Sequence, residues 1–346
     1  MNPAAPSVIT AARAPTRIDF GGGWTDVPPY PEEQGGFVCN LAIARYAVAH
    51  VVPRSNRLRS HAGTHAGDNP DVGDDGHSAE LALARAVRAR AGISDSTIHL
   101  VNDFPIGSGL GGSSSAGVAA LGALETCHGR TGWSDTERAA IAERSRQVEV
   151  EDLRVAGGRQ DHYAAAFGGA LGLEFDTSVR VNRIPLSREL AIEMAQRCTL
   201  VYTGQSRISG DTIRAVLDAY AARESRVTTA LKRMAALARS MAIAILSADL
   251  DTLAALVDEH WAAQRALHPS ITTPDIDRIL DLARGAGAGG GKALGASGGG
   301  CVVVLAPAER ASDVRRAVAS AGTVIPFDVD HDGLAVVSTP QSGEHK

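Results

Sequence analysis

The sequence predicts a protein of two domains, each built from both helices and strands. Three observations carry this prediction. The chain has 346 residues, a length typical of two domains that each bury a core of their own. Short apolar runs with strand character alternate with longer segments of helical periodicity in both halves. Glycine-rich turns punctuate these segments at residues 21–23, 107–112 and 295–300. We expect one domain over residues 1–190 and a second over residues 191–346.

Composition excludes several classes of function. The chain is 44% hydrophobic and 21% charged, with a net charge of −5, as in a soluble globular protein. It has no basic run, so we expect no nucleic-acid partner. It has no apolar run of about 18 residues and no signal-peptide pattern, so we expect no membrane partner and a cytoplasmic location. The four cysteines are widely spaced, which predicts reduced and mostly packed thiols: Cys39, Cys127, Cys198 and Cys301.

Strands are expected where apolar residues run together or alternate with polar ones. In the first strand Arg17 and Asp19 alternate with Ile18 and Phe20, the period of two of a half-buried strand. The expected strands, in chain order, are residues 11–20, 37–43, 46–52, 97–101, 171–175, 179–184, 198–203, 301–305 and 324–329.

Helices are expected where apolar residues recur every three to four positions. Ser134 and Glu137 form a capping-box pattern at the start of one of them. The polar residues 53–77 are expected to form a loop or lid, because their histidines and aspartates fit no metal-ligand spacing. The expected helices are residues 78–91, 116–125, 134–154, 157–169, 212–223, 226–246, 250–267, 273–284 and 312–321, with a further segment beginning at 185–193.

A glycine- and serine-rich stretch lies between an expected strand and an expected helix. It reads Pro-Ile-Gly-Ser-Gly-Leu-Gly-Gly-Ser-Ser-Ser-Ala over residues 105–116. Strand, loop and helix in this order direct free backbone N–H groups toward an anion. The serines can cap the helix or offer hydroxyls to a phosphate or to Mg²⁺. No lysine follows the glycines as in a P-loop, and only Glu125 or Asp135 lies near the spacing of a dinucleotide fingerprint. A flexible linker is the alternative.

Two further sites of polar residues follow glycines. Trp24, Thr25 and Asp26 come directly after the triple glycine, which favours a pocket for a polar ligand, with an ordinary hairpin loop as the alternative. Asp161 follows Gly157-Gly158 at the start of a helix, where it could instead serve as a helix cap.

Two acids and a third glycine stretch complete the set of candidates. Glu149 and Glu151 lie near the end of the helix expected over 134–154, where a solvated helix face is the alternative to a ligand role. Residues 285–300 are rich in glycine and lead directly into a buried strand, which favours a structured backbone turn over a linker.

Together these stretches resemble the GHMP small-molecule kinases, which include galactokinase and the homoserine, mevalonate and phosphomevalonate kinases. Residues 105–111 match the family's Pro-x-x-x-Gly-Leu-Gly-Ser-Ser-Ala motif until Gly112 replaces its first serine. The first stretch is similar to galactokinase's Ala-Pro-Gly-Arg-Val-Asn-Leu-Ile-Gly-Glu-His-Thr-Asp, and Gly158-Arg-Gln-Asp161 matches the Gly-x-x-Asp that carries the catalytic aspartate. The positions identical to the galactokinase motif are Ala14, Pro15, Arg17, Gly22, Thr25 and Asp26.

The resemblance implies an α+β fold, with a first domain like ribosomal protein S5 domain 2, a ferredoxin-like second domain, and the active site between them. It implies ATP and Mg²⁺ as cofactors. Asp161 would orient or deprotonate the attacking hydroxyl, and Arg17 would stabilise the transferring group and hold Asp161 ionised. Mg²⁺ would be held by Glu149 and Ser113, with Glu151 and Ser115 as alternatives. The ATP phosphates would lie against Gly107, Ser108, Gly109, Leu110, Gly111, Gly112, Ser113, Ser114 and Ser115. The sugar would contact Trp24, Thr25, Asp26, Gly158, Arg207, Gly298 and Gly299.

Two sugar-kinase branches of the family are the most similar. The Gly-Gly-Trp-Thr-Asp-x-Pro-Pro-Tyr run over 22–30 looks like the kinase portion of fucokinases, whereas residues 158–169, 202–207 and 260–267 look like D-glycero-D-manno-heptose 7-phosphate kinases. The leading expectation is phosphorylation of that heptose 7-phosphate to the 1,7-bisphosphate at the anomeric hydroxyl, which is more acidic than an ordinary alcohol. A fucokinase-like free-sugar 1-kinase and a non-catalytic sugar and ATP sensor are the alternatives.

A substrate that already carries a phosphate would need a basic residue to hold it. Arg207 is the first candidate, and Arg54, Arg57 and Arg59 are others. The expected partners are therefore small molecules only, a sugar or sugar phosphate, and the expected assembly is a monomer or a homodimer.

Overall fold

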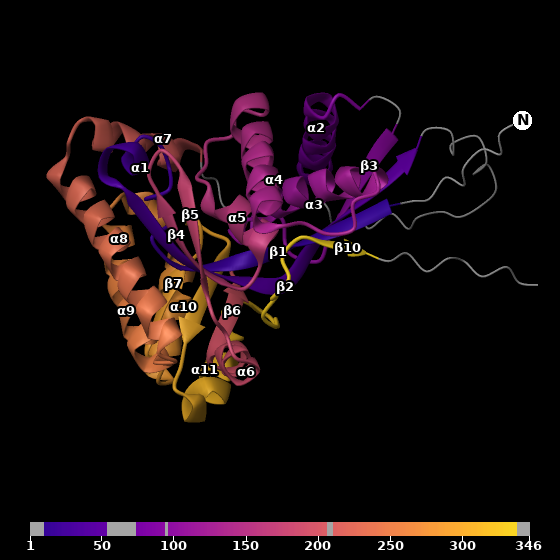
Figure 1. Cartoon of the computed structure of the whole chain (residues 1–346). Helices are drawn as coiled ribbons and strands as arrows, with labels where there is room; N and C mark the ends of the chain where they lie inside the picture. The colour runs from indigo at the N-terminus through magenta and orange to yellow at the C-terminus, as the bar shows by residue number, and fades with distance from the viewer. Residues whose placement is uncertain (1–9, 54–73, 94–95, 206–209, 338–346) are drawn as a thin grey trace, which may run out of the picture.

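Two antiparallel sheets organise the computed structural model, which describes residues 10–53, 74–93, 96–205 and 210–337 (Figure 1). The first sheet has the order β10-β1-β2-β4-β5, with β3 also paired to β2, and the second has the order β7-β8-β6-β9. The strands of the first sheet are β1 (Thr10–Gly21), β2 (Gly36–Pro53), β3 (Ser96–Asn102), β4 (Ala170–Phe175), β5 (Val179–Ile184) and β10 (Ala335–Val337). Those of the second are β6 (Cys198–Tyr202), β7 (Gly290–Ala293), β8 (Cys301–Leu305) and β9 (Thr323–Ile325).

The second strand corrects the sequence prediction, because residues 37–43 and 46–52 belong to one strand, β2, and not to two. Its pairing with β1 shifts register between Pro15 and Thr16, so two residues of β2 bulge away from β1. Proline 15 has no N–H to donate to the ladder, which favours a bulge at this place. The amide of Ala44, inside the bulge, donates instead to the carbonyl of Asp328 at 2.8 Å.

Helices packed on the first sheet position the central loop. In Figure 1 α2 (Asp74–Arg90), α3 (Gly112–Cys127) and α4 (Asp135–Gln147) lie above the sheet. Residues 114–124 of α3 are all buried, as expected of a helix whose side chains are small or apolar on every side. The capping box of Ser134 and Glu137 at the start of α4 is confirmed. The chain then makes a π-helical turn over Val148–Asp152 before α5 (Gln160–Phe167).

The second sheet has the β-α-β-β-α-β order of a ferredoxin-like domain, as predicted. Long helices run between β6 and β7, and α11 (Ala311–Val318) connects β8 to β9. The longest, α8 (Ser225–Leu246), also packs on β1, β2 and β4 of the first sheet. The remaining helices are α1 (Tyr30–Gln34), α6 (Arg188–Arg197), α7 (Gly210–Ala221), α9 (Leu250–Arg265) and α10 (Pro274–Gly285).

The end of the described chain departs from the predicted division at residue 190. Strand β10 pairs with β1, so residues 335–337 extend the first sheet and not the second. Cys39, Cys198 and Cys301 are buried free thiols, as expected, and Cys127 is exposed. Within the described ranges no helix is long and apolar enough to cross a membrane.

Candidate active site

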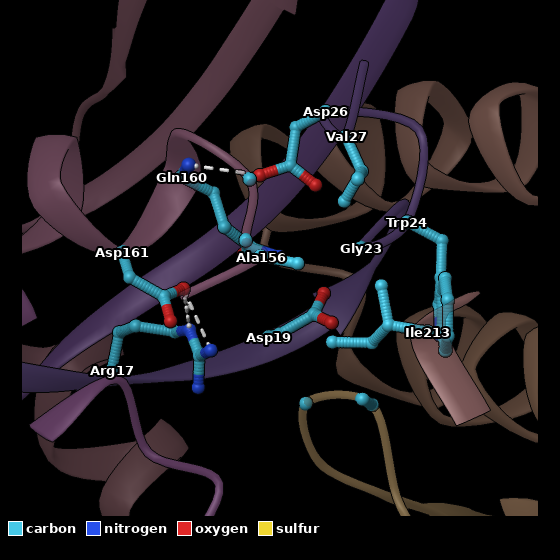
Figure 2. A pocket seen from close by; sticks show the side chains of 14 residues that line it. Arg17, Asp19, Gly23, Trp24, Asp26, Val27, Ala156, Gln160, Asp161 and Ile213 are labelled. Atoms are coloured by element: carbon cyan, nitrogen blue, oxygen red, sulfur yellow. Dashed lines mark hydrogen bonds and ion pairs between the residues drawn. The ribbon is translucent and has the colours of Figure 1, made fainter. Parts of the chain in front are cut away.

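Two neighbouring pockets share one residue, Asp161. The first, which we call the acidic pocket and which Figure 2 shows, has a cavity volume of about 80 Å³. It is lined by Arg17, Asp19, Gly23, Trp24, Asp26, Val27, Ala156, Gly157, Gly158, Gln160, Asp161, Ile213, Gly295 and Ala296. The second, the glycine pocket, has a cavity volume of about 190 Å³ and is built mainly from the loop before α3 and the first turn of that helix. Residues 107–109 and 111–114 line it, together with Glu149 and Asp161.

The glycine pocket is formed by a loop whose backbone approaches Asp161 closely. Gly111 has a φ of +76°, and a Cβ placed on it would lie 3.0 Å from Asp161. Helix α3 starts one residue later, and its first backbone bond runs from the Ser115 amide to the Gly111 carbonyl at 3.0 Å. The amides of residues 112–114 therefore have no acceptor within the helix and are available to an anion.

The sequence suggested that the serines could cap α3, but in the structure they do not. The N-cap of α3 is Gly111, and no side chain caps the helix. Ser115 donates to the Pro15 carbonyl at 2.7 Å and does not line the pocket, and neither does buried Leu110. Ser113 and Ser114 line it, as do the predicted Gly107, Ser108, Gly109, Gly111 and Gly112.

Glu149 lies in the π-helical turn and reaches the glycine pocket. Its Oε2 accepts a bond from the Ser114 hydroxyl at 3.0 Å and lies 3.0 Å from His162 Nε2. Burial would raise the pKa of Glu149, but His162, Ser113 and Ser114 outweigh it and hold that pKa below its ordinary value. Glu151, the alternative, pairs with Arg90 and lies outside both pockets.

Arg17 and Asp161 form an ion pair on the wall between the pockets. The Arg17 Nε and Nη2 atoms lie 2.8 and 2.6 Å from Asp161 Oδ1, as Figure 2 shows. Arg17 Nη1 also donates to the Gly109 carbonyl at 2.6 Å, and the Arg17 side chain is 3% exposed. One arginine thus joins strand β1, the glycine loop and α5, while Asp161 stays 22% exposed to the pockets.

Asp26 connects the loop after β1 to the start of α5. Its Oδ2 accepts from the amides of Arg159 and Gln160 at 2.8 and 2.9 Å. Gly158 is required there, because a Cβ on it would lie 2.0 Å from the same oxygen. Burial, followed by the nearby charges of Asp161 and Asp19, raises the pKa of Asp26 to about 6 even though the Gln160 amide opposes the shift.

A buried ion pair joins Asp19, which lines the acidic pocket, to Lys292 of the second domain. Lys292 Nζ donates to the carbonyl and to Oδ2 of Asp19, at 2.9 and 3.1 Å. His260 Nε2 accepts from the Gly22 amide at 2.8 Å, and burial lowers the pKa of that histidine to about 3, so the ring is neutral. These contacts hold β1 and the triple glycine against β7 and α9.

The other predicted ligand-binding residues divide into four groups. Trp24, Asp26 and Gly158 line the acidic pocket. Thr25 is buried and donates to the Gly22 carbonyl at 2.7 Å, which holds the loop and not a ligand. Gly298 and Gly299 line neither pocket. Gly295 and Ala296 of the same glycine-rich stretch line the acidic pocket instead. Arg207, Arg54, Arg57 and Arg59 lie outside the described residues.

Sequence reasoning missed several residues of the acidic pocket and its support. Asp19 was visible only as one polar position of a strand, and Lys292 stood in a glycine run that looked like a loop. Gln160 lay inside the Gly-Arg-Gln-Asp motif, where the motif itself was the available signal. His260 begins the 260–267 stretch that resembles the heptose 7-phosphate kinases, but nothing in that stretch indicated its bond with the Gly22 amide.

The raised pKa of Asp26 predicts how stability depends on pH. The folded state binds a proton to Asp26 up to about pH 6, whereas the unfolded chain releases it near pH 3.8. The contribution of Asp26 to the free energy of unfolding therefore falls as pH rises from about 4 to about 6, by about 3 kcal/mol. We expect Asp26→Asn to unfold at higher urea concentration than the parent at pH 8, with little difference at pH 4. Equal pH slopes for the two proteins would contradict the assignment.

Comparison with known proteins adds a family context to this geometry. A model of the GHMP kinase N-terminal domain matches residues 79–169, and a model of the GHMP kinase C-terminal domain matches residues 241–324. A bifunctional fucokinase/GDP-fucose pyrophosphorylase from Arabidopsis thaliana is 28% identical over 334 residues, which is 89% of this chain but 31% of that protein. This chain thus spans less than a third of that relative.

Two heptose kinases match over nearly their full length. The D-glycero-alpha-D-manno-heptose 7-phosphate kinase of Campylobacter jejuni is 27% identical, with 93% of this chain and 97% of that protein covered. The crystal structure of a D-glycero-D-manno-heptose 1-phosphate kinase from Bacteroides thetaiotaomicron superposes with a TM-score of 0.70 at 25% identity, covering 96% of this chain and 100% of the other.

Proposed function

Because this chain belongs to the GHMP kinases, we propose that it transfers the γ-phosphoryl group of ATP to the anomeric hydroxyl of a sugar. One observation carries the proposal most: Asp161 lines both the acidic pocket and the glycine pocket. A carboxylate at that junction can face a hydroxyl held in one pocket and a phosphate held in the other. Phosphoryl transfer needs this arrangement of acceptor, donor and charge.

The two residues at the junction have complementary roles. Asp161 accepts the proton of the attacking hydroxyl, and an anomeric hydroxyl is acidic enough for a carboxylate to suffice. Arg17 fixes the orientation of Asp161 through two bonds to one oxygen, which leaves Oδ2 free of that pair. Its guanidinium also places a positive charge next to the site where charge moves in the reaction.

The glycine pocket fits the phosphates of ATP. The free amides of residues 112–114 can bind an anion, and Gly111 leaves room for Asp161 beside them, because a Cβ on Gly111 would lie 3.0 Å from that carboxylate. Glu149 and the hydroxyls of Ser113 and Ser114 offer the oxygen donors that Mg²⁺ prefers. Bound there, the ion would neutralise phosphate charge. The described residues contain no cluster of three or more acids, histidines or cysteines that could hold a metal ion.

We propose D-glycero-D-manno-heptose 7-phosphate as the sugar. The heptose 7-phosphate kinase of Campylobacter jejuni supports this choice because it matches over almost its whole length. The product would be the 1,7-bisphosphate. The 7-phosphate would have to lie outside the acidic pocket, because that pocket contains three carboxylates.

A free sugar is the second candidate, and the charge of the acidic pocket favours it. Asp19, Asp26 and Asp161 line the pocket, and the one cation among its described lining residues, Arg17, is already bonded to Asp161. A neutral sugar such as L-fucose would meet no repulsion there. The fucokinase portion of the Arabidopsis relative is consistent with this alternative.

A substrate panel tests the proposal and separates the two candidates. ATP consumption is measured with heptose 7-phosphate, the unphosphorylated heptose, L-fucose, galactose and mannose, and the phosphorylated position is read by ³¹P NMR. We expect the highest kcat/KM for heptose 7-phosphate, with the new phosphate at the anomeric position. A higher kcat/KM for a free sugar would replace heptose phosphate by that sugar. Phosphorylation only at a primary hydroxyl would overturn the anomeric assignment, and binding without turnover would favour a sensor.

A further inference from the structure

Asp19 has one carboxylate oxygen without a hydrogen-bond partner at the wall of the acidic pocket. The residue lies on β1 and is 1% exposed. Its Oδ2 is bonded to Lys292, but its Oδ1 has no hydrogen-bond partner among the described residues. Asp19 also lines the acidic pocket, and in Figure 2 its carboxylate points toward the middle of that space. A buried charged acceptor without a donor is unfavourable, so the pocket favours a ligand that supplies the donor.

The neighbouring groups indicate what kind of donor this is. Gln160 Oε1 is a second buried acceptor without a partner among the described residues, and Gln160 lines the same pocket. With Asp26 and Asp161 nearby, a phosphate or carboxylate at this place would meet like charges. An ammonium group and a set of neutral hydroxyls both carry donors, and several hydroxyls satisfy separated acceptors without placing a charge in the pocket. The ligand that best fits these acceptors is therefore a neutral polyol.

Lys292 explains how the chain keeps a carboxylate at this depth. The lysine is completely buried, comes from the second domain and does not line the pocket. Burial opposes the charge of Asp19, but Lys292, followed by Arg17, outweighs it and lowers the pKa of that carboxyl. Lys292 is thus a positioning residue: it holds one oxygen of Asp19 and leaves the other for the pocket.

We infer that Asp19 is a substrate-binding residue whose Oδ1 accepts a hydrogen bond from a sugar hydroxyl other than the one that is phosphorylated. The inference rests on the proposed sugar kinase function and adds a specificity determinant to it. It requires a neutral hydroxyl at one fixed position of the sugar. A sugar lacking that hydroxyl would leave Asp19 Oδ1 without a donor and would bind more weakly.

The test combines a substitution of Asp19 with the removal of single hydroxyls from the substrate. The best sugar of the panel and its monodeoxy derivatives are assayed with the parent protein and with Asp19→Asn. We expect Asp19→Asn to raise the KM for the sugar by about 10- to 100-fold, with kcat and the KM for ATP within about threefold. One monodeoxy derivative should be bound equally weakly by both proteins, because it lacks the hydroxyl of this bond and Asp19→Asn then has no bond left to remove.

A matched control separates this role from a structural one. Asp330 is also buried, at 3% exposure, and its Oδ1 accepts from the Gly333 amide at 2.7 Å, away from both pockets. Asp330→Asn should lower the melting temperature and leave the KM for the sugar unchanged. If Asp19→Asn behaves in the same way, Asp19 only stabilises the fold and the inference is overturned.

A second variant tests the same side chain while the charges of Asp19 and Lys292 are kept. A Cβ on Gly23 would lie 2.4 Å from Asp19 Oδ2 and 2.8 Å from Gln160 Nε2, so Gly23→Ala displaces both side chains and, with them, the acceptors Asp19 Oδ1 and Gln160 Oε1. We expect the sugar KM to rise as for Asp19→Asn. Gly132→Ala, where a Cβ meets nothing within 4 Å, is the control. An unchanged sugar KM in Gly23→Ala would count against the inference even if Asp19→Asn failed to fold.

Calorimetric binding of the same sugars distinguishes the failure of this inference from that of the proposed function. A sugar that binds through an Asp19-dependent hydroxyl but is never phosphorylated would overturn the kinase proposal and support the contact. If a sugar is phosphorylated but all its monodeoxy derivatives are equally sensitive to Asp19→Asn, the Asp19–hydroxyl contact is overturned and the kinase proposal is supported. If no sugar of the panel binds, both are wrong.

Discussion

We expect Asp161→Asn to lower kcat by at least about 100-fold while ATP still binds. The asparagine keeps the shape of the side chain and can still accept from Arg17, but it cannot take a proton from the attacking hydroxyl. The glycine pocket is otherwise unchanged, because the amides of residues 112–114 belong to α3 and not to α5. Single-turnover phosphoryl transfer and equilibrium binding of ATP measure the two effects separately.

The control for this variant is an acid in the same kind of structural position. Asp135 also lies in the first turn of a helix and pairs with an arginine, Arg183, at 2.8 Å, but it lines neither pocket. Asp135→Asn should retain the parent kcat. A near-normal kcat in Asp161→Asn would show that Asp161 is only a structural acid of α5. The helix-cap alternative is already wrong, because the N-cap of α5 is Arg159 and no side chain caps that helix.

Local patterns in the sequence predicted much of the fold and the central part of the site. Residues 179–184 and 301–305 form strands with the predicted bounds, and the capping box at Ser134 forms as expected. Arg17 and Asp161 are bonded, as their shared place in the family motifs implied. The strands and the capping box depend on neighbouring residues, whereas the Arg17–Asp161 pair was implied by two short family motifs that lie far apart in the chain.

What the sequence did not reveal depends on contacts between distant segments. Strand β10 is three residues long and exists because β1, more than 300 residues earlier, offers it an edge. Lys292 lies in a strand and not in a loop because β8 pairs with the glycine run on which it stands. The free oxygen of Asp19 follows from that pairing, since only the fold brings Lys292 to the other oxygen. No local periodicity records such a relation.

The second large effect is expected for Arg17→Met. Methionine fills a similar volume but leaves Asp161 and the Gly109 carbonyl without their donors. Removing one partner of a buried ion pair costs about 3–5 kcal/mol, and the 22% exposure of Asp161 places this case toward the lower end. Loss of the guanidinium should also lower kcat by about 10² to 10³, the scale of removing one donor that stabilises developing charge. Urea unfolding and kcat per folded molecule are the two measurements.

Two further variants separate the charge of Arg17 from its geometry and from general stability. Arg17→Lys keeps the charge, but a single ammonium cannot bond Asp161 and the Gly109 carbonyl with the geometry of a planar guanidinium. Its kcat should therefore lie between those of the parent and Arg17→Met. Arg197 is also buried and bonds the Ala306 carbonyl at 2.9 Å, outside both pockets. Arg197→Met should lose stability and keep its kcat. If Arg17→Met matches Arg197→Met in both measurements, Arg17 supports the fold alone, and the charge for phosphoryl transfer must come from another group.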